Sequence, residues 1–187
     1  MFIRTERLFL RPAWPEDMDD IVEALRGNAV ARTLAQPGLP RTVSEIRALL
    51  ESERSLRLPQ FMMYLRAPGG PRLVGGIGLV ESDEDVELVY WITPAFSGRG
   101  FAGEAVRAIL DQARSLGHTR IVAWQPVLRD ADARVLLAAG FEDTYRVEER
   151  FSPGDGEVLP ACRFEASLVR RAVSMPHPAQ YAESLSA

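Results

Sequence analysis

The sequence has no lysine, one cysteine and two histidines, and each shortage excludes a kind of chemistry. All 22 basic residues are arginine, so P-loop phosphate binding and Schiff-base catalysis lack the lysine amine that both require. Cys162, His118 and His177 are too few for an internal disulfide or a Cys/His zinc site. We therefore expect no metal centre, and the scarcity of cysteine favours a reducing, cytoplasmic location.

The chain also lacks an excess of positive charge and a long apolar run. It has 26 acidic residues against 22 basic ones, for a net charge of −4, and this balance gives no positive field to hold a nucleic-acid backbone. No stretch approaches the roughly 18 apolar residues of a membrane span. We expect neither nucleic acid nor a membrane as a partner. The 187 residues are enough for one globular domain with a single core.

The spacing of apolar residues predicts an α/β chain with antiparallel strands in its middle part. Strands are predicted where apolar and polar residues alternate or where turn residues bound a short apolar run. These segments are 5–12, 61–66, 72–81, 85–92, 120–125, 141–151 and 159–169. The segments with helical spacing are 16–26, 42–50, 100–117 and 130–139. We expect residues 1–169 to form the domain and residues 170–187 to form a peripheral C-terminal extension.

The segment from Ile92 to Val106, ITPAFSGRGFAGEAV, is the strongest candidate for chemistry. A strand ends here, a loop follows and a helix begins, so the first N–H groups of the helix have no partner within it. The helix dipole adds partial positive charge at the same place, which suits a phosphate. At Gly98 and Gly100 the missing Cβ allows a positive φ and a close approach of an anion. The alternative is that these glycines only allow a tight turn between the strand and the helix and bind no ligand.

The same glycines match the dinucleotide fingerprint G-x-G-x-x-G, but their context does not. In that fold the glycines end the first strand, and an acidic residue follows about 20 positions later. Here several predicted strands precede the loop, five residues separate Ile92 from Gly98, and the next strand ends in Gln125-Pro126. A dinucleotide enzyme is therefore the weaker alternative.

Gly100 and Ala102 fill the last two places of the pattern Gln/Arg-x-x-Gly-x-Gly/Ala, and the loop resembles the acetyl-CoA loop of the GNAT acyltransferases. The resemblance is to the RimJ/RimL-like branch and covers most of the chain. Its motifs are TERLFLRP (5–12), ELVYW (87–91), GRGFAGEA (98–105) and RVLLAAGF (134–141). It implies a GNAT-like α/β (α+β) fold, with a mixed, mostly antiparallel central sheet flanked by helices and splayed strands that form the acetyl-CoA cleft.

The resemblance also implies a set of cofactor-binding residues. The amides of Ile92 and Thr93 would meet the pantetheine and acetyl end of acetyl-CoA, and the oxyanion donor would be a backbone N–H around Ile92. The residues expected at the pyrophosphate are Arg99, Gly100, Phe101, Ala102 and Gly103. Arg129, with Arg134, could pair the 3′-phosphate, because a guanidinium fork fits phosphate geometry. The alternative is that both arginines lie on a solvent-exposed helix face.

The chain departs from the family pattern at three places. Ser97 stands where Gln or Arg is expected, and residues 128–132, LRDAD, replace the usual Asp-Asn-x-x-Ser. Leu136 stands where several relatives carry a tyrosine that protonates the departing thiolate. That acid is therefore missing or is supplied elsewhere. A thiol has an ordinary pKa of about 8.5, so its thiolate is a fair leaving group without full protonation, and turnover need not be lost.

Glu87 is the candidate catalytic base. It resembles the glutamate that serves as base in lysine-acetylating relatives and lies 13 residues before Gly100. On an extended strand Glu87 shares one face with Val89 and Trp91. A structural role, with Glu87 paired to an arginine across the sheet, is the alternative of equal weight.

The resemblance implies an N-acetyltransferase that moves the acetyl group of acetyl-CoA to a primary amine. The RimJ/RimL-like resemblance suggests a protein N-terminal α-amine, and a small-molecule amine is also open. An α-amine with a pKa of about 7.8 is partly neutral at pH 7, whereas a lysine amine at about 10.4 is not, so an α-amine tolerates a weak base. A non-catalytic acyl-CoA sensor is the alternative function, and a homodimer is left open.

Overall fold

The computed structural model describes residues 1–25, 43–51, 55–82, 85–127, 130–152 and 157–169. The strands in these ranges are β1 (Ile3–Arg4), β2 (Leu8–Arg11), β3 (Gln60–Leu65), β4 (Arg72–Ser82), β5 (Asp85–Ile92), β6 (Arg120–Pro126), β7 (Glu142–Ser152) and β8 (Glu157–Ser167). The helices are η1 (Pro15–Asp17), α1 (Met18–Leu25), α3 (Val43–Glu51), η2 (Pro94–Phe96), α4 (Phe101–Ser115) and α5 (Asp130–Ala138). The predicted extension, 170–187, lies outside the described residues.

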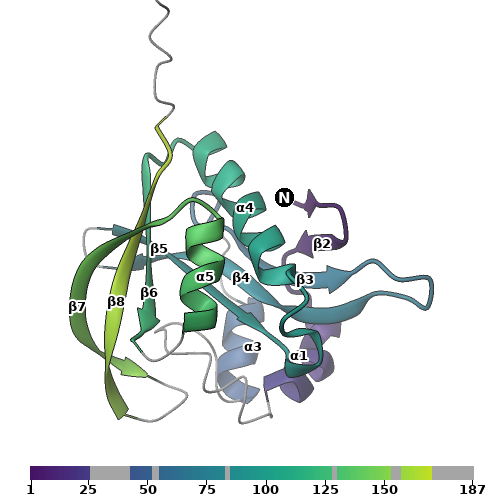
Figure 1. Ribbon diagram of the computed structural model, residues 1–187. Coiled ribbons are helices and arrows are strands. Elements are labelled where there is room, and N and C mark those ends of the chain that lie inside the picture. Colours follow the sequence, from purple (N-terminus) through teal and green to yellow (C-terminus); the bar gives the residue numbers. More distant parts are fainter. Residues whose placement is uncertain (26–42, 52–54, 83–84, 128–129, 153–156, 170–187) are drawn as a thin grey trace, which may run out of the picture.

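The described strands form one sheet in the order β1-β2-β3-β4-β5-β6-β8-β7 (Figure 1). Within it β5 and β6 are parallel, and the other neighbouring strands are antiparallel. The predicted α/β fold, a mixed and mostly antiparallel sheet flanked by helices, is therefore confirmed. None of the described helices has the length and apolar composition needed to cross a lipid bilayer.

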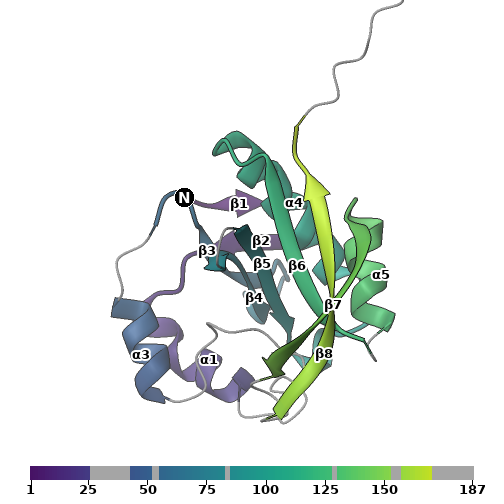
Figure 2. The ribbon, with the colours of Figure 1, turned by 90° about the vertical axis from the view of Figure 1, so that its left-hand side faces the viewer.

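Period-two alternation gives the sheet two apolar faces, each covered by helices. On one face Leu88 and Tyr90 of β5 belong to the core cluster that also contains the buried residues of α4 and Leu136 of α5. On the other face Trp91 of β5 packs with Ile21 of α1 and Ile46 of α3. The sheet consequently lies between α4 and α5 on one side and α1 and α3 on the other (Figure 2).

The carboxylate of Asp17, at the end of η1, fastens this turn to the sheet. It accepts two hydrogen bonds from the Arg11 guanidinium at 2.7 and 2.6 Å, one from the Trp14 N–H at 2.7 Å and one from the Tyr64 hydroxyl at 2.7 Å. Burial opposes ionisation of Asp17, but these hydrogen bonds outweigh it and hold the pKa of Asp17 below its ordinary value. The helix predicted over residues 16–26 includes Asp17, but the sequence did not predict these partners.

We expect Asp17→Asn to lower the free energy of unfolding by about 3 to 5 kcal/mol at neutral pH, because Arg11 would be left without its counter-charge in a buried site. A lowered folded-state pKa means that the contribution of Asp17 is complete above the unfolded pKa and is lost as pH falls through the folded pKa. The difference between the variant and the unmodified protein should therefore shrink as pH falls below about 4. Urea unfolding at several pH values measures both effects.

Asp111→Asn is the matched control. Asp111 also pairs with an arginine, Arg114, at 2.6 Å, but its side chain is 77% exposed, so its removal should change stability little. Equal losses in the two variants would contradict the role given to Asp17.

Candidate active site

The parallel strands β5 and β6 separate soon after they meet. Among the described residues they pair at one position, Glu87 with Val122, whereas β5 stays paired with β4 from Asp85 to Ile92. The carboxyl-terminal part of β5 therefore has a partner on one edge only. The predicted splay of neighbouring parallel strands is present at this point of the sheet.

Main-chain groups at the end of β5 point in two directions. The Thr93 N–H donates to the Val74 carbonyl at 2.8 Å, on the β4 side. Because hydrogen-bonding positions alternate along an antiparallel pair, the N–H of Ile92 points to the opposite edge, where β6 diverges. The coenzyme contact of the Ile92 amide stays a prediction. The amide of Thr93 is already used, so a contact from this residue falls to its hydroxyl, which is buried and has no hydrogen-bond partner among the described residues.

The loop after β5 opens α4 with unpaired main-chain donors. Gly98 and Gly100 have φ values of +71° and +78°, the left-handed conformation that glycine adopts at no steric cost. Gly100 is the N-cap of α4, and no side chain caps the helix there. The amides of Phe101, Ala102 and Gly103, which begin the helix, have no partner within it. The positive φ values predicted at Gly98 and Gly100 are therefore present, and anion binding by this loop stays a prediction.

Glu104, in the first turn of α4, binds the start of the chain. Its carboxylate accepts hydrogen bonds from the Thr5 hydroxyl, the Arg7 N–H at 2.8 Å and the Arg7 guanidinium at 2.7 Å. Burial opposes its ionisation, but these bonds outweigh burial and hold the pKa of Glu104 below its ordinary value. The Arg7 guanidinium also donates to the Arg99 carbonyl at 3.0 Å. These contacts fix the loop to β2.

Arginine side chains surround the same loop. Arg72 and Arg99 lie over the Phe96 ring, at 4.9 and 5.6 Å from its centroid. A guanidinium nitrogen of Arg107 lies 3.4 Å from where a Cβ on Gly103 would be. The sequence predicted Arg99 here, but Arg72 and Arg107 were not predicted. Their signal was weak, because arginines are spread along the whole chain and Arg72 is distant from the loop in sequence.

Two further arginines were predicted to reach the coenzyme. Arg129 lies outside the described residues, so the structure does not locate its side chain. Arg134 is exposed on α5. The contact predicted for Arg129 stays a prediction.

Glu87 is fully buried on the face of β5 opposite α4 and α5, and it has an arginine partner. A guanidinium nitrogen of Arg150, in β7, lies 3.0 Å from its Oε2. The same guanidinium lies over the Trp124 ring, 4.7 Å from the centroid. Arg150 therefore places a positive charge beside this buried carboxylate. The sequence left open that Glu87 pairs with an arginine, and the structure shows this pair. It lies next to the position where β5 and β6 diverge.

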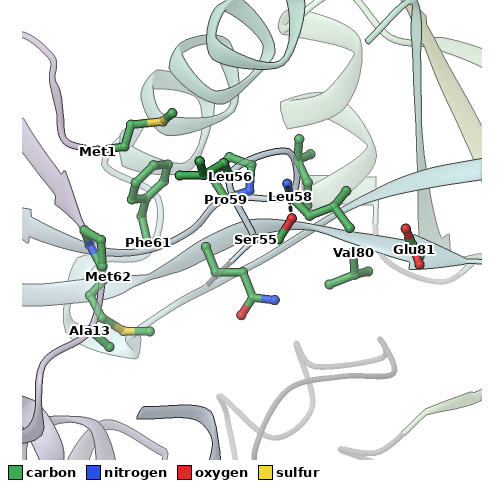
Figure 3. Close-up of a pocket in the computed structure, with 13 residues that line it drawn as sticks. Met1, Ala13, Ser55, Leu56, Leu58, Pro59, Phe61, Met62, Val80 and Glu81 are labelled. Atoms are coloured by element: carbon green, nitrogen blue, oxygen red, sulfur yellow. Dashed lines mark hydrogen bonds between the residues drawn. The ribbon is translucent and has the colours of Figure 1, made fainter. Parts of the chain in front are cut away.

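A pocket of about 330 Å³ lies elsewhere, where the segment 55–59 and the start of the chain meet β3 and β4 (Figure 3). Leu56, Phe61 and Val80 are among the residues that line it. Val80 pairs with Glu87 in the β4–β5 register, but none of the described residues predicted to bind the coenzyme lines this pocket. The pocket and the glycine loop are therefore separate features.

Solved structures with the same fold include several acetyltransferases. A GNAT-family acetyltransferase from Bacillus anthracis is 21% identical, with a TM-score of 0.73, covering 90% of this chain and 99% of that one. Spermidine N-acetyltransferase from Vibrio cholerae, solved with CoA and spermine, is 19% identical, with a TM-score of 0.72 and coverages of 87% and 96%. A candidate ribosomal-protein-serine acetyltransferase from Vibrio cholerae is 22% identical, with a TM-score of 0.66 and coverages of 89% and 97%.

These likenesses establish the fold, and sequence comparison adds the family. A search of curated proteins finds no match to the chain. Residues 7–142 match the acetyltransferase (GNAT) domain, and this match includes β5, the glycine loop and α4. Because it spans most of the 187 residues, the protein belongs to the GNAT family of acetyltransferases.

Proposed function

We propose that the protein transfers the acetyl group of acetyl-CoA to the α-amine of a protein or peptide N-terminus. The observation that carries the proposal is the uncapped start of α4, whose unpaired amides follow the left-handed Gly100 and adjoin the splay of β5 and β6. Acetyl-CoA is the donor that GNAT acetyltransferases use. Its diphosphate suits a helix N-terminus, and its chain suits the diverging strands.

Each described residue of the site has a proposed role in binding. The amides of Phe101 to Gly103 hold the diphosphate, and the side chains of Arg72, Arg99 and Arg107 supply positive charge around it. The Ile92 N–H, which points to the splay, donates to the thioester carbonyl and stabilises the oxyanion that forms during attack. The Thr93 hydroxyl donates to an amide carbonyl of the pantetheine.

Glu87 lies on the face of β5 that is turned away from α4 and α5, and it receives the proton that the attacking amine loses. The amine nitrogen attacks the thioester carbon, the C–N bond forms, the C–S bond breaks, and the thiolate leaves with the electron pair. Arg150 pairs with Glu87, and a carboxylate that is stabilised by a nearby positive charge is a weaker base. A weak base suits an α-amine of pKa about 7.8 better than an amine near 10.4. This comparison favours peptide N-termini over polyamines such as spermidine.

Release of free thiol from acetyl-CoA tests the function directly. With a panel of short peptides carrying free N-termini, thiol release should exceed that with spermidine or with the same peptides blocked at the N-terminus. Mass spectrometry should find one added acetyl group on the α-amine. Binding of CoA without thiol release for any amine would instead support the alternative function, a non-catalytic sensor of acyl-CoA.

We expect Gly100→Glu to weaken CoA binding at least about tenfold, because a carboxylate would stand among amides that hold phosphate. The backbone at this position is also left-handed, so any side chain adds strain. Isothermal titration calorimetry measures the dissociation constant.

Gly117→Glu is the control for strain. Gly117 follows α4 with φ +88° and has open space where a Cβ would lie, so the variant carries the same backbone strain at the opposite end of the helix. It should bind CoA normally. Equal affinity of the Gly100 variant and the unmodified protein would remove the loop from the proposed site.

We expect Glu87→Gln to lower turnover by about tenfold or more near pH 6.5 and by much less near pH 9, where more of the amine is already neutral. Arg150→Met keeps the carboxylate but removes the positive charge beside it, so its turnover should also fall near pH 6.5 and should recover toward that of the unmodified protein as pH rises. Steady-state rates across pH measure both variants. An equal loss for Glu87→Gln at both pH values would assign Glu87 a structural role only.

A further inference from the structure

Tyr90 has a buried hydroxyl that no other described group satisfies. The residue is 4% exposed, and its Oη has no hydrogen-bond partner among the described residues. Native proteins rarely leave such a group unsatisfied, because the hydroxyl loses its water and gains nothing in exchange. A phenylalanine of the same shape would fill the core without this cost. A polar group of a bound ligand would satisfy this hydroxyl.

The position of Tyr90 places this hydroxyl beside the splay. The residue lies two positions before Ile92 on β5, and the strand has no β6 partner here. Its side chain points to the α4 and α5 face, where it joins the core cluster with Leu136. Asp132, in the first turn of α5, is close enough to act on it electrostatically, since burial first and this charge second raise the pKa of Tyr90. The phenol consequently lies between the end of β5 and the start of α5.

Glu87 and Tyr90 stand on opposite faces of the same strand. Three residues, about 10 Å of strand, separate them, and the Ile92 N–H lies at the edge between the two faces. A thioester bound at that edge would have the base on one side and the phenol on the other.

We propose that the Tyr90 hydroxyl donates a hydrogen bond to the sulfur of CoA as the thiolate departs. The proposal rests on the proposed acetyl transfer. When the C–S bond breaks, the electron pair stays on sulfur, and a donor placed there stabilises the developing negative charge. The phenol keeps its proton throughout, because burial disfavours the phenolate. The thiolate takes up a proton from solvent after release. Tyr90 is thus a catalytic residue that acts on the leaving group.

Tyr90→Phe tests the proposal through two effects of opposite sign. In the free protein the melting temperature should stay the same or rise, because the lost hydroxyl had no partner. With acetyl-CoA and amine at saturation, kcat should fall about tenfold or more. In the complex with CoA, the pKa of the bound thiol should rise by about one unit, since the thiolate loses its donor. Ultraviolet absorbance of the thiolate measures this pKa, with the desulfo-CoA complex as the blank.

Tyr64→Phe is the matched control. It also removes a buried phenol hydroxyl, but one that donates to Asp17 at 2.7 Å on the other face of the sheet. This variant should melt at a lower temperature and leave the pKa of the bound thiol unchanged.

Three results would overturn the inference. They are an unchanged kcat in Tyr90→Phe, an unchanged pKa of the bound thiol, and a melting temperature lowered as in Tyr64→Phe, which would reveal a partner in the free protein. If the unmodified protein neither binds CoA nor releases thiol, the proposed function itself fails, and this outcome is distinct from the other three.

Discussion

The hydrogen bonds that Glu104 accepts from Thr5 and Arg7 determine what the start of α4 can bind. An acidic side chain in the first helical turn commonly accepts hydrogen bonds from the N–H groups of its own helix. Here the carboxylate is held by the chain segment before β2. No described side chain caps the start of α4, where Gly100 has a left-handed conformation. The acidic group in the first turn of α4 is thus already engaged by Thr5 and Arg7.

Strand β5 divides the remaining chemistry between two faces of the sheet. Alternation places Glu87 and Trp91 toward α1 and α3, and Tyr90 toward α4 and α5. The main-chain edge between them is open because β6 has diverged. A donor molecule from one face and an acceptor from the other can therefore meet at this edge without sharing a route. One extended segment supplies a proton acceptor, an amide donor and a buried phenol within a few residues.

Local patterns in the sequence predicted the elements and the glycine loop because these depend on neighbours along the chain. Alternation found β2 to β5, and the glycine spacing found the left-handed positions 98 and 100. The pairs Arg7–Glu104, Arg150–Glu87 and Tyr64–Asp17 join residues 97, 63 and 47 positions apart. The periodicity of the sequence does not reveal such long-range contacts, because they form only when the folded strands are in register. The alternative of an arginine partner for Glu87 was open, but the sequence could not select Arg150.

The ion pairs that join β5 to the strands beyond it gather at one end of the splay. Asp85 bonds Arg120 of β6 and Arg163 of β8, and Glu87 bonds Arg150 of β7. All of these acidic partners lie at or before the position where β5 and β6 are still paired. These ion pairs therefore join the two parts of the sheet at one end of the splay. Among the described residues no ion pair crosses the other end. A ligand bound at the free end would lie away from these ion pairs, and because Glu87 and Asp85 are largely buried, added salt should screen the pairs only weakly.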